Sequence, residues 1–205
     1  MIRAILPPFA LAVSVACTRP PADQPVAIDS AVRRELLARV AVDQAVRDSF
    51  TAQLRTGGVV TPAMVVSMAA VDSANLDWLR QEVRARGLPT RARVGEEGVR
   101  AATLLIQHAD ADPGFQAEVL PALEVAYRAG DVTGEALALL TDRVAKAQGR
   151  PQRYGTQATM RDGRMVIDPI DDSVGVDARR AALGLPPLAR YLEVLDSVYG
   201  KREAP

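Results

Sequence analysis

The sequence has 205 residues, 48% of them hydrophobic, which suits one globular domain preceded by a leader. Its 25 Lys and Arg residues balance its 25 Asp and Glu residues, so the formal net charge at pH 7 is zero. Because the chain has no basic run and no aromatic residues interleaved with basic ones, it lacks the electrostatic footprint of a nucleic-acid-binding protein. Nucleic acid is therefore excluded as a partner.

Residues 1–17 have the pattern of an export signal. Arg3 is followed by an apolar run that is too short to cross a bilayer as a mature helix but suits the hydrophobic region of a signal peptide. The run closes on Ser14-Val15-Ala16 before Cys17, which resembles the lipobox of bacterial lipoproteins and implies cleavage after residue 16 with lipidation of Cys17. Cys17 is the only cysteine, so no intramolecular disulfide can form.

This interpretation divides the chain into three parts. We expect a signal peptide at 1–16, a Pro-rich tether at 17–27 and a single mainly helical domain at 28–200. Double acylation of Cys17 would hold the protein on a membrane, because each buried CH2 contributes about 0.8 kcal/mol. Thr18 is not the aspartate of an inner-membrane retention signal, which favours the outer membrane where the cell has one. The alternative is an ordinary cleavage site and a secreted, soluble protein.

Apolar residues at helical spacing predict five helices in the next part of the chain. The first is capped by Asp29 or Ser30 and stopped by Gly57-Gly58, the second runs from Thr61-Pro62 to Gly87, the third from about Glu96 to His108, the fourth from Asp112-Pro113 to Gly130, and the fifth from about Gly134 to Gln148. The first two are expected to pair as an antiparallel hairpin. The third and fifth are apolar on nearly every side, which is typical of buried helices.

The pattern changes after the fifth helix. Asp162-Gly163 lies between two short runs rich in Thr, Met, Val and Ile, which predicts a β-hairpin with strands near 156–160 and 164–168. A short helix and an amphipathic helix, joined around Gly184 and Pro186-Pro187, are expected to finish the chain. The predicted fold class is mainly α: a compact multi-helix domain with one small β-hairpin near the C-terminal third.

Several short segments resemble, in order, a bacterial family known only as a domain of unknown function. They are QHAD (107–110), FQ (115–116), LTDRV (140–144) and QRYGTQ (152–157), with DQAVR (43–47), DSAN (72–75) and DARRAALGLPPL (177–188) also similar. The resemblance covers about 43–188. One departure is Leu88, where the family favours tryptophan. The resemblance implies a domain identity and adds no chemistry.

The candidate site centres on the only histidine. His108 shares a face with Leu104 and Ala101, so it is expected to point inward, where Asp142 or a carbonyl would pair with it. In one hypothesis His108, Asp142 and Arg143 form a satisfied polar network that locks the central helices together. In the other the same three residues are catalytic, with His108 as a general acid or base oriented by a carboxylate and Arg143 holding an anionic group.

Further polar residues are candidates for ligand binding: Gln107, Asp110, Gln116, Tyr154 and Gln157. Tyr154 and Gln157 are placed either at the mouth of a cleft between hairpin and helices or, for Tyr154, with the ring packed on the core. His108, Asp110 and Asp112 alternate in a way that would suit Mg, Ca or Mn, but Asp112 has a simpler role as a helix cap. We therefore predict no metal site and no cofactor.

Two functions from different classes remain open. Because the chain has no GxSxG motif, we assign no covalent mechanism. The first hypothesis is an envelope-tethered binding or interaction domain, whose partners are the membrane and an unknown envelope ligand or small molecule. The second is a small hydrolase or lyase that uses His108, Asp142 and Arg143.

Overall fold

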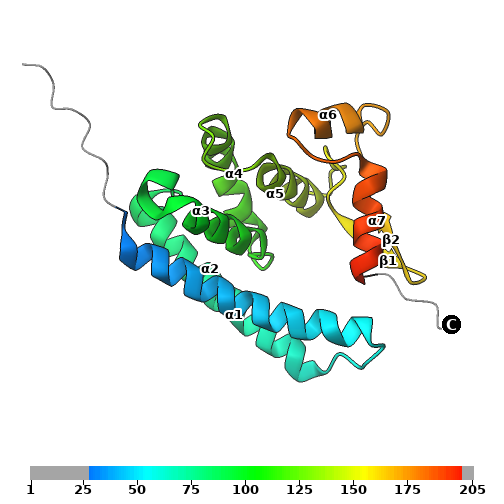
Figure 1. Ribbon diagram of the computed structural model, residues 1–205, viewed down its shortest axis with the longest axis horizontal. Coiled ribbons are helices and arrows are strands. Elements are labelled where there is room, and N and C mark those ends of the chain that lie inside the picture. Colours follow the sequence, from blue (N-terminus) through cyan, green and yellow to red (C-terminus); the bar gives the residue numbers. More distant parts are fainter. Residues whose placement is uncertain (1–27, 200–205) are drawn as a thin grey trace, which may run out of the picture.

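The computed structural model describes residues 28–199, which form seven helices and one two-stranded antiparallel hairpin (Figure 1). The predicted fold class, mainly α with one small β-hairpin in the C-terminal third, is confirmed. The signal peptide and tether predicted for 1–27 lie outside the described residues. Within 28–199, no helix has the length and apolar character needed to cross a membrane.

Two long helices pair as the predicted hairpin. α1 spans Ser30–Arg55 and α2 spans Pro62–Arg86, and they run antiparallel along one side of the domain (Figure 1). The Asp29 carboxylate caps α1 by accepting from the Val32 N–H at 3.1 Å, and Thr61 caps α2. Both starts agree with the sequence prediction.

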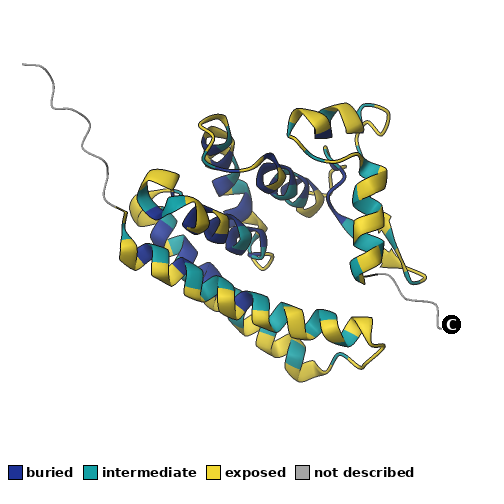
Figure 2. Ribbon diagram, in the orientation of Figure 1, coloured by how far each residue is buried: buried dark blue, intermediate teal, exposed yellow. Residues whose placement is uncertain are grey.

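Three central helices form most of the core. α3 spans Arg91–Gln107, α4 spans Pro113–Arg128 and α5 spans Gly134–Ala147. Buried residues are concentrated on these helices and on the facing half of the α1–α2 hairpin (Figure 2). α3 begins about one turn before the predicted start, because residues 91–94 form a helical turn that joins the rest at a kink, with Gly95 at φ 72°.

The C-terminal part packs a hairpin against a helix. β1 (Ala158–Arg161) pairs with β2 (Arg164–Ile167), and α7 (Leu188–Tyr199) packs against β2 after the short α6 (Val176–Ala182). The connecting Asp162 and Gly163 have φ values of 50° and 83°, the two positive values that a type I′ turn requires. The Asp-Gly prediction of a hairpin is thereby confirmed.

Candidate functional site

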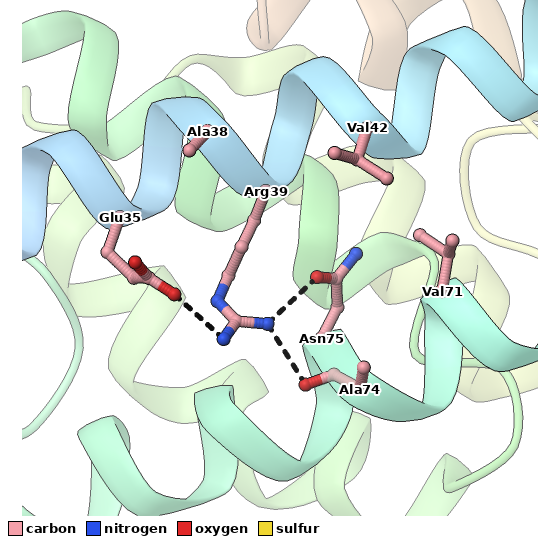
Figure 3. Close-up of a pocket in the computed structure, with 7 residues that line it drawn as sticks. All are labelled: Glu35, Ala38, Arg39, Val42, Val71, Ala74 and Asn75. Carbon is pink, nitrogen blue, oxygen red and sulfur yellow. Dashed lines mark hydrogen bonds and ion pairs between the residues drawn. The ribbon is translucent and has the colours of Figure 1, made fainter.

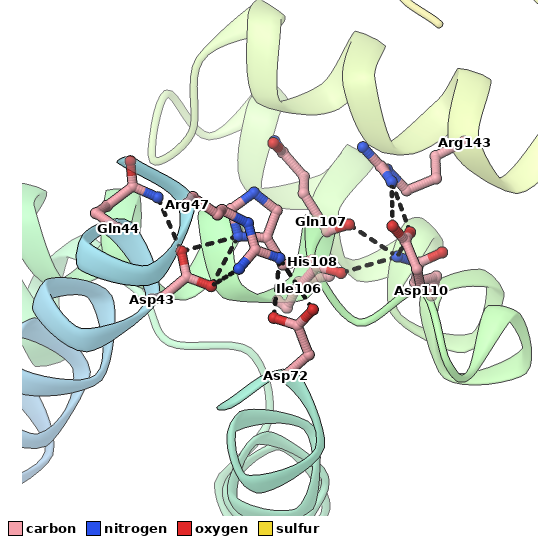
Figure 4. A network of polar contacts seen from close by, with 10 residues as sticks. Asp43, Gln44, Arg47, Asp72, Ile106, Gln107, His108, Asp110 and Arg143 are labelled. Carbon is pink, nitrogen blue, oxygen red and sulfur yellow. Dashed lines mark hydrogen bonds and ion pairs between the residues drawn. The ribbon is translucent and has the colours of Figure 1, made fainter. Parts of the chain in front are cut away.

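The histidine lies at the end of α3 and contacts α1. His108 Nδ1 is 3.0 and 2.9 Å from the two carboxylate oxygens of Asp43 (Figure 4). Because an ionised carboxylate only accepts hydrogen bonds, Nδ1 carries a proton and donates a hydrogen bond to Asp43. Within residues 28–199, Nε2 has no hydrogen-bond partner, and the imidazole keeps 18% of its surface exposed. When the ring is in its neutral form, the free lone pair is therefore on Nε2.

Asp43 is held in place from several sides. Its side chain is fully buried, accepts from Gln44 Nε2 at 2.8 Å and pairs with Arg47 Nη1 at 2.9 Å. Arg47 also donates to Asp72 on α2 at 2.8 and 3.1 Å, so it bridges the two helices. Burial raises the pKa of Asp43. The hydrogen bonds from His108 and Gln44 and the charges of His108 and Arg47 lower it by more than burial raises it, so the pKa of Asp43 lies below its ordinary value.

The predicted pairing of His108 with Asp142 is wrong. Asp142, fully buried on α5, accepts the backbone N–H groups of Arg153 at 2.8 Å, Tyr154 at 3.0 Å and Thr156 at 2.8 Å. The Thr156 hydroxyl donates to the same carboxylate at 2.9 Å. Since the chain folds back on α5 after the helix ends, these donors occupy both carboxylate oxygens, and Asp142 caps a loop.

Arg143 does not contact the imidazole either, which corrects the expected three-residue cluster. Its Nη1 donates to both carboxylate oxygens of Asp110 at 2.6 and 2.7 Å, near the surface (Figure 4). Gln116 is buried next to this pair and donates from Nε2 to the carbonyls of Ile106 at 3.0 Å and Gln107 at 3.1 Å. Gln116 therefore satisfies carbonyls that the end of α3 leaves unpaired, a structural role.

Gln107 is a predicted ligand-binding residue that directly precedes the histidine in sequence. Its side-chain amide group is unengaged within residues 28–199. The residue is 9% exposed, and within 28–199 its side-chain amide makes no hydrogen bond and is not sealed from solvent. The Gln107 amide and His108 Nε2, on consecutive residues, are two polar groups that make no hydrogen bond within residues 28–199. Burial without a protein partner is costly for such groups, so a ligand or water must satisfy them.

The loop 152–157 is a rigid scaffold. Gln152 is buried, and its side chain donates to the carbonyls of Gln157 and Asp168, both at 2.9 Å, and accepts from the Gln157 N–H at 2.6 Å. Arg180, 1% exposed, donates to the Tyr154 carbonyl at 2.7 Å. The Gln157 side chain is itself buried and donates to Thr156 Oγ1 at 3.2 Å. These contacts assign a structural role to most of the QRYGTQ segment.

Tyr154 lines a surface hollow that does not include Gln157. A hollow of about 360 Å³ includes Tyr154 with Tyr127 and Arg128 of α4, Thr141 of α5, and Arg153. Neither Gln157 nor a residue of the β-hairpin lines this hollow, so it does not join Tyr154 to Gln157. Its walls come from α4, α5, the loop after α5 and Leu183.

A second hollow, of about 280 Å³, lies between α1 and α2 (Figure 3). Arg39 crosses it, donating to the Ala74 carbonyl at 3.1 Å and to Asn75 Oδ1 at 3.2 Å, and pairing with Glu35 at 2.8 Å. The cation is thus engaged by the protein itself. The remaining walls are Ala38, Val42, Val71 and Ala74, which makes the hollow mainly apolar.

Sequence patterns missed Asp43 as the partner of His108. Asp43 follows the inward-facing Val32 and Leu36 at helical spacing, and an acidic residue at such a position was the available signal. The alternating residues His108, Asp110 and Asp112 are the alternative metal ligands that the sequence suggests. Asp112 instead caps α4 by accepting from the Phe115 N–H at 3.1 Å, and it pairs with Arg80. In the part of the chain that the structure describes, no group of His, Cys, Asp or Glu is arranged to hold a metal ion.

Comparison with known proteins gives one family. Residues 30–203 match DUF6624, which is described as a family of unknown function. No curated protein matches the chain, and no solved structure matches it.

Proposed function

The chain belongs to the DUF6624 family, and we propose that it is an exported, lipid-anchored protein of the cell envelope whose helical domain binds a ligand beside His108. The ligand class is a small molecule or an envelope component that accepts and donates hydrogen bonds. The observation that carries the binding proposal is the imidazole of His108, which the fully buried Asp43 holds through Nδ1 while Nε2 has no partner within residues 28–199; the amide of the preceding residue, Gln107, is also unengaged there.

Partial exposure around Asp43 supports a binding role. The side chains of His108, Arg47 and Asp72 are 18%, 22% and 21% exposed, while the carboxylate they surround is fully buried. Binding sites commonly combine a few convergent polar groups with a fixed, desolvated centre. Asp43 fixes the imidazole, and the partly exposed ring remains available to a ligand.

The anchor is proposed from the N-terminal sequence. Arg3, the apolar run and Ser14-Val15-Ala16 precede the only cysteine, Cys17, and the family match begins after the Pro-rich segment, at residue 30. This arrangement is typical of a signal peptide, an acylated cysteine and a spacer before a folded domain. The outer membrane is the proposed destination where the cell has one, because Thr18 follows the cysteine.

Lipid labelling tests the anchor. Cells that express the full chain are grown with a clickable fatty acid, and the protein is expected to carry the label and to partition into the detergent phase. Cys17→Ser should lose both properties, whereas Thr18→Ser, a matched change one residue later, should keep them. Unlabelled native protein in the aqueous phase would contradict lipidation and would support the secreted alternative.

Titration of the protein with envelope fractions tests the binding site. The single histidine gives one set of imidazole signals, which are followed while a polar small-molecule extract or a detergent extract of the envelope is added. One extract is expected to shift the His108 signals saturably, and Gln107→Ala should weaken that response. Arg143→Ala, at the neighbouring surface pair, serves as the control and should leave it unchanged. Signals that no extract moves would contradict a binding site at His108.

The Asp43–His108 pair also favours a second candidate function, acid–base catalysis in a small hydrolase or lyase. A carboxylate on Nδ1 orients an imidazole so that Nε2 can take a proton from water, which is a common general-base arrangement. Asp43 replaces Asp142 and Arg143 in this hypothesis. Hydrolysis of a panel of p-nitrophenyl esters that disappears in His108→Gln at unchanged melting temperature would favour catalysis. Absence of turnover leaves the binding proposal as the better account.

A further inference from the structure

The far end of the α1–α2 hairpin has no covering element. We define the hairpin tip as residues 44–74, which lie between the last buried residue of α1, Asp43, and the first of α2, Asn75. Every residue of the tip is exposed or half-buried, and Figure 2 shows this end of the hairpin without dark blue. We propose that the hairpin tip rests in the surface of the lipid bilayer to which the protein is anchored.

The tip is apolar although it is uncovered. Val59 is 79% exposed, Val66 67%, Val65 48% and Leu54 45%. Single exposed apolar residues are ordinary on a protein surface, whereas several large ones within the short segment 54–66 mark an interaction site. The four residues come from the end of α1, the connecting loop and the first turn of α2.

Charge is nearly absent from the outer part of the tip, residues 49–71. Between Asp48 and Asp72 the only charged residue is Arg55. A cation at the boundary between apolar side chains and water suits anionic headgroups, whereas a carboxylate there would oppose them. Soluble helices that face water on one side normally carry charges of both signs along that side, so the tip departs from a solvated helix pair.

The seam between the helices at the tip is lined by uncharged residues, four of them Ala or Ser. A hollow of about 430 Å³ there is bounded by Ala45, Val46, Ser49, Ala63, Met64 and Ser67. None of these side chains is charged, so the hollow can accept hydrocarbon without burying an ion.

The length of chain before the domain favours a bilayer as the occupant, and this step rests on the proposed lipid at Cys17. Residues 18–27 span at most about 36 Å when fully extended. α1 has 26 residues and is about 39 Å long. Since the tether joins the start of α1 and the tip lies at its other end, an inclined α1 brings the tip to the same bilayer (Figure 1). A domain held this close meets the bilayer at a high effective concentration.

Tryptophan quenching tests the contact on the full-length protein reconstituted in vesicles of phosphatidylethanolamine and phosphatidylglycerol with brominated acyl chains. Val59→Trp places the probe at the tip, and Val174→Trp is the matched control, because Val174 is 96% exposed in the segment before α6. The parent chain, with Trp78 alone, gives the background. We expect brominated lipid to quench the added tryptophan of Val59→Trp at least about twofold more than that of Val174→Trp.

A second variant tests whether the apolar side chains of the tip cause the extra quenching. Adding Val65→Asp and Val66→Asp to Val59→Trp should abolish the extra quenching, since the two carboxylates are exposed in water and costly in lipid. Equal quenching of both probes would overturn the proposal. So would concentration-dependent dimers that Val66→Asp dissociates, because the tip would then pair with a second copy. If the native protein carries no fatty-acid label at Cys17 but its tip is still quenched, the lipid anchor is overturned and the contact of the tip with the bilayer stands. This outcome separates the two proposals.

Discussion

At the scale of single residues, the fold uses one buried carboxylate to fix the only imidazole. Asp43 and His108 are 65 positions apart, and their contact joins the middle of α1 to the end of α3. Arg47 balances the charge of Asp43, so the desolvation of the carboxylate is offset by an ion pair and two hydrogen bonds. The imidazole gains a fixed orientation with Nε2 unengaged, which is the property that both candidate functions need.

Removing the carboxylate should destabilise the protein. Asp43→Ala leaves His108 Nδ1 and Arg47 without their buried partner, and we expect the free energy of unfolding to fall by about 3 kcal/mol. Asp110→Ala is the matched control, because it removes an acidic partner of Arg143 that is 60% exposed, and it should cost less than about 1 kcal/mol. Urea denaturation of the two variants measures the difference. Equal losses would contradict the assignment of Asp43 as a buried centre.

The same carboxylate predicts a pH dependence. The pKa of Asp43 is lower in the folded protein than the ordinary value of 3.8, because hydrogen bonds and charges from His108, Gln44 and Arg47 outweigh burial. A group with a depressed folded pKa contributes stability above its unfolded pKa and loses it as the pH falls through its folded pKa. Stability should therefore decline below about pH 4. Asp43→Asn should flatten this decline in denaturation curves from pH 6 to pH 3, and an unchanged slope would contradict the contribution of Asp43.

At the scale of elements, the C-terminal part depends on a side chain of α5. Asp142 binds three backbone N–H groups and a hydroxyl of the loop 153–156, so it positions the chain that leads into β1. Gln152 and Arg180 complete the loop from its other sides. The short hairpin and α7 have few buried residues of their own, which makes this polar clamp important for their placement.

Loss of the clamp should be severe. In Asp142→Ala several buried donors lose their acceptor at once, and we expect destabilisation of about 3 to 5 kcal/mol. Arg143→Ala, at the next position on α5, is the control and should change stability by less than about 1 kcal/mol, because its ion pair lies at the surface. Hydrogen exchange of the Tyr154 and Thr156 amides reports the effect locally. Protection of these amides that survives in Asp142→Ala would contradict the clamp.

The helices and hairpin could be predicted because their signals are local. Asp29, Thr61 and Asp112 act as the predicted helix caps, and Asp162-Gly163 forms the predicted turn. The pairing of polar side chains could not be predicted in the same way. Helical spacing predicts that His108 faces inward, but which carboxylate it meets depends on how the helices cross, and that information is not contained in the period of any one helix.

At the scale of the whole molecule, polar groups that the sequence suggested as one centre are distributed over three places. His108 joins Asp43 between α1 and α3, Arg143 joins Asp110 at the surface, and Asp142 holds the loop after α5. The hairpin tip extends beyond the core, at the end of α1 opposite to the start of the domain (Figure 1). In our proposal an N-terminal lipid and the tip hold the domain at the bilayer, while the groups beside Asp43 bind the ligand.

The protonation state of the one histidine tests the central claim, that Asp43 fixes His108 and leaves Nε2 free. Long-range ¹H–¹⁵N spectra are recorded for the native protein, Asp43→Asn and Asp142→Asn. We expect the neutral imidazole to carry its proton on Nδ1, Asp43→Asn to change this tautomer preference, and Asp142→Asn to leave it unchanged. A proton on Nε2 in the native protein, or a response to Asp142→Asn instead of Asp43→Asn, would contradict it.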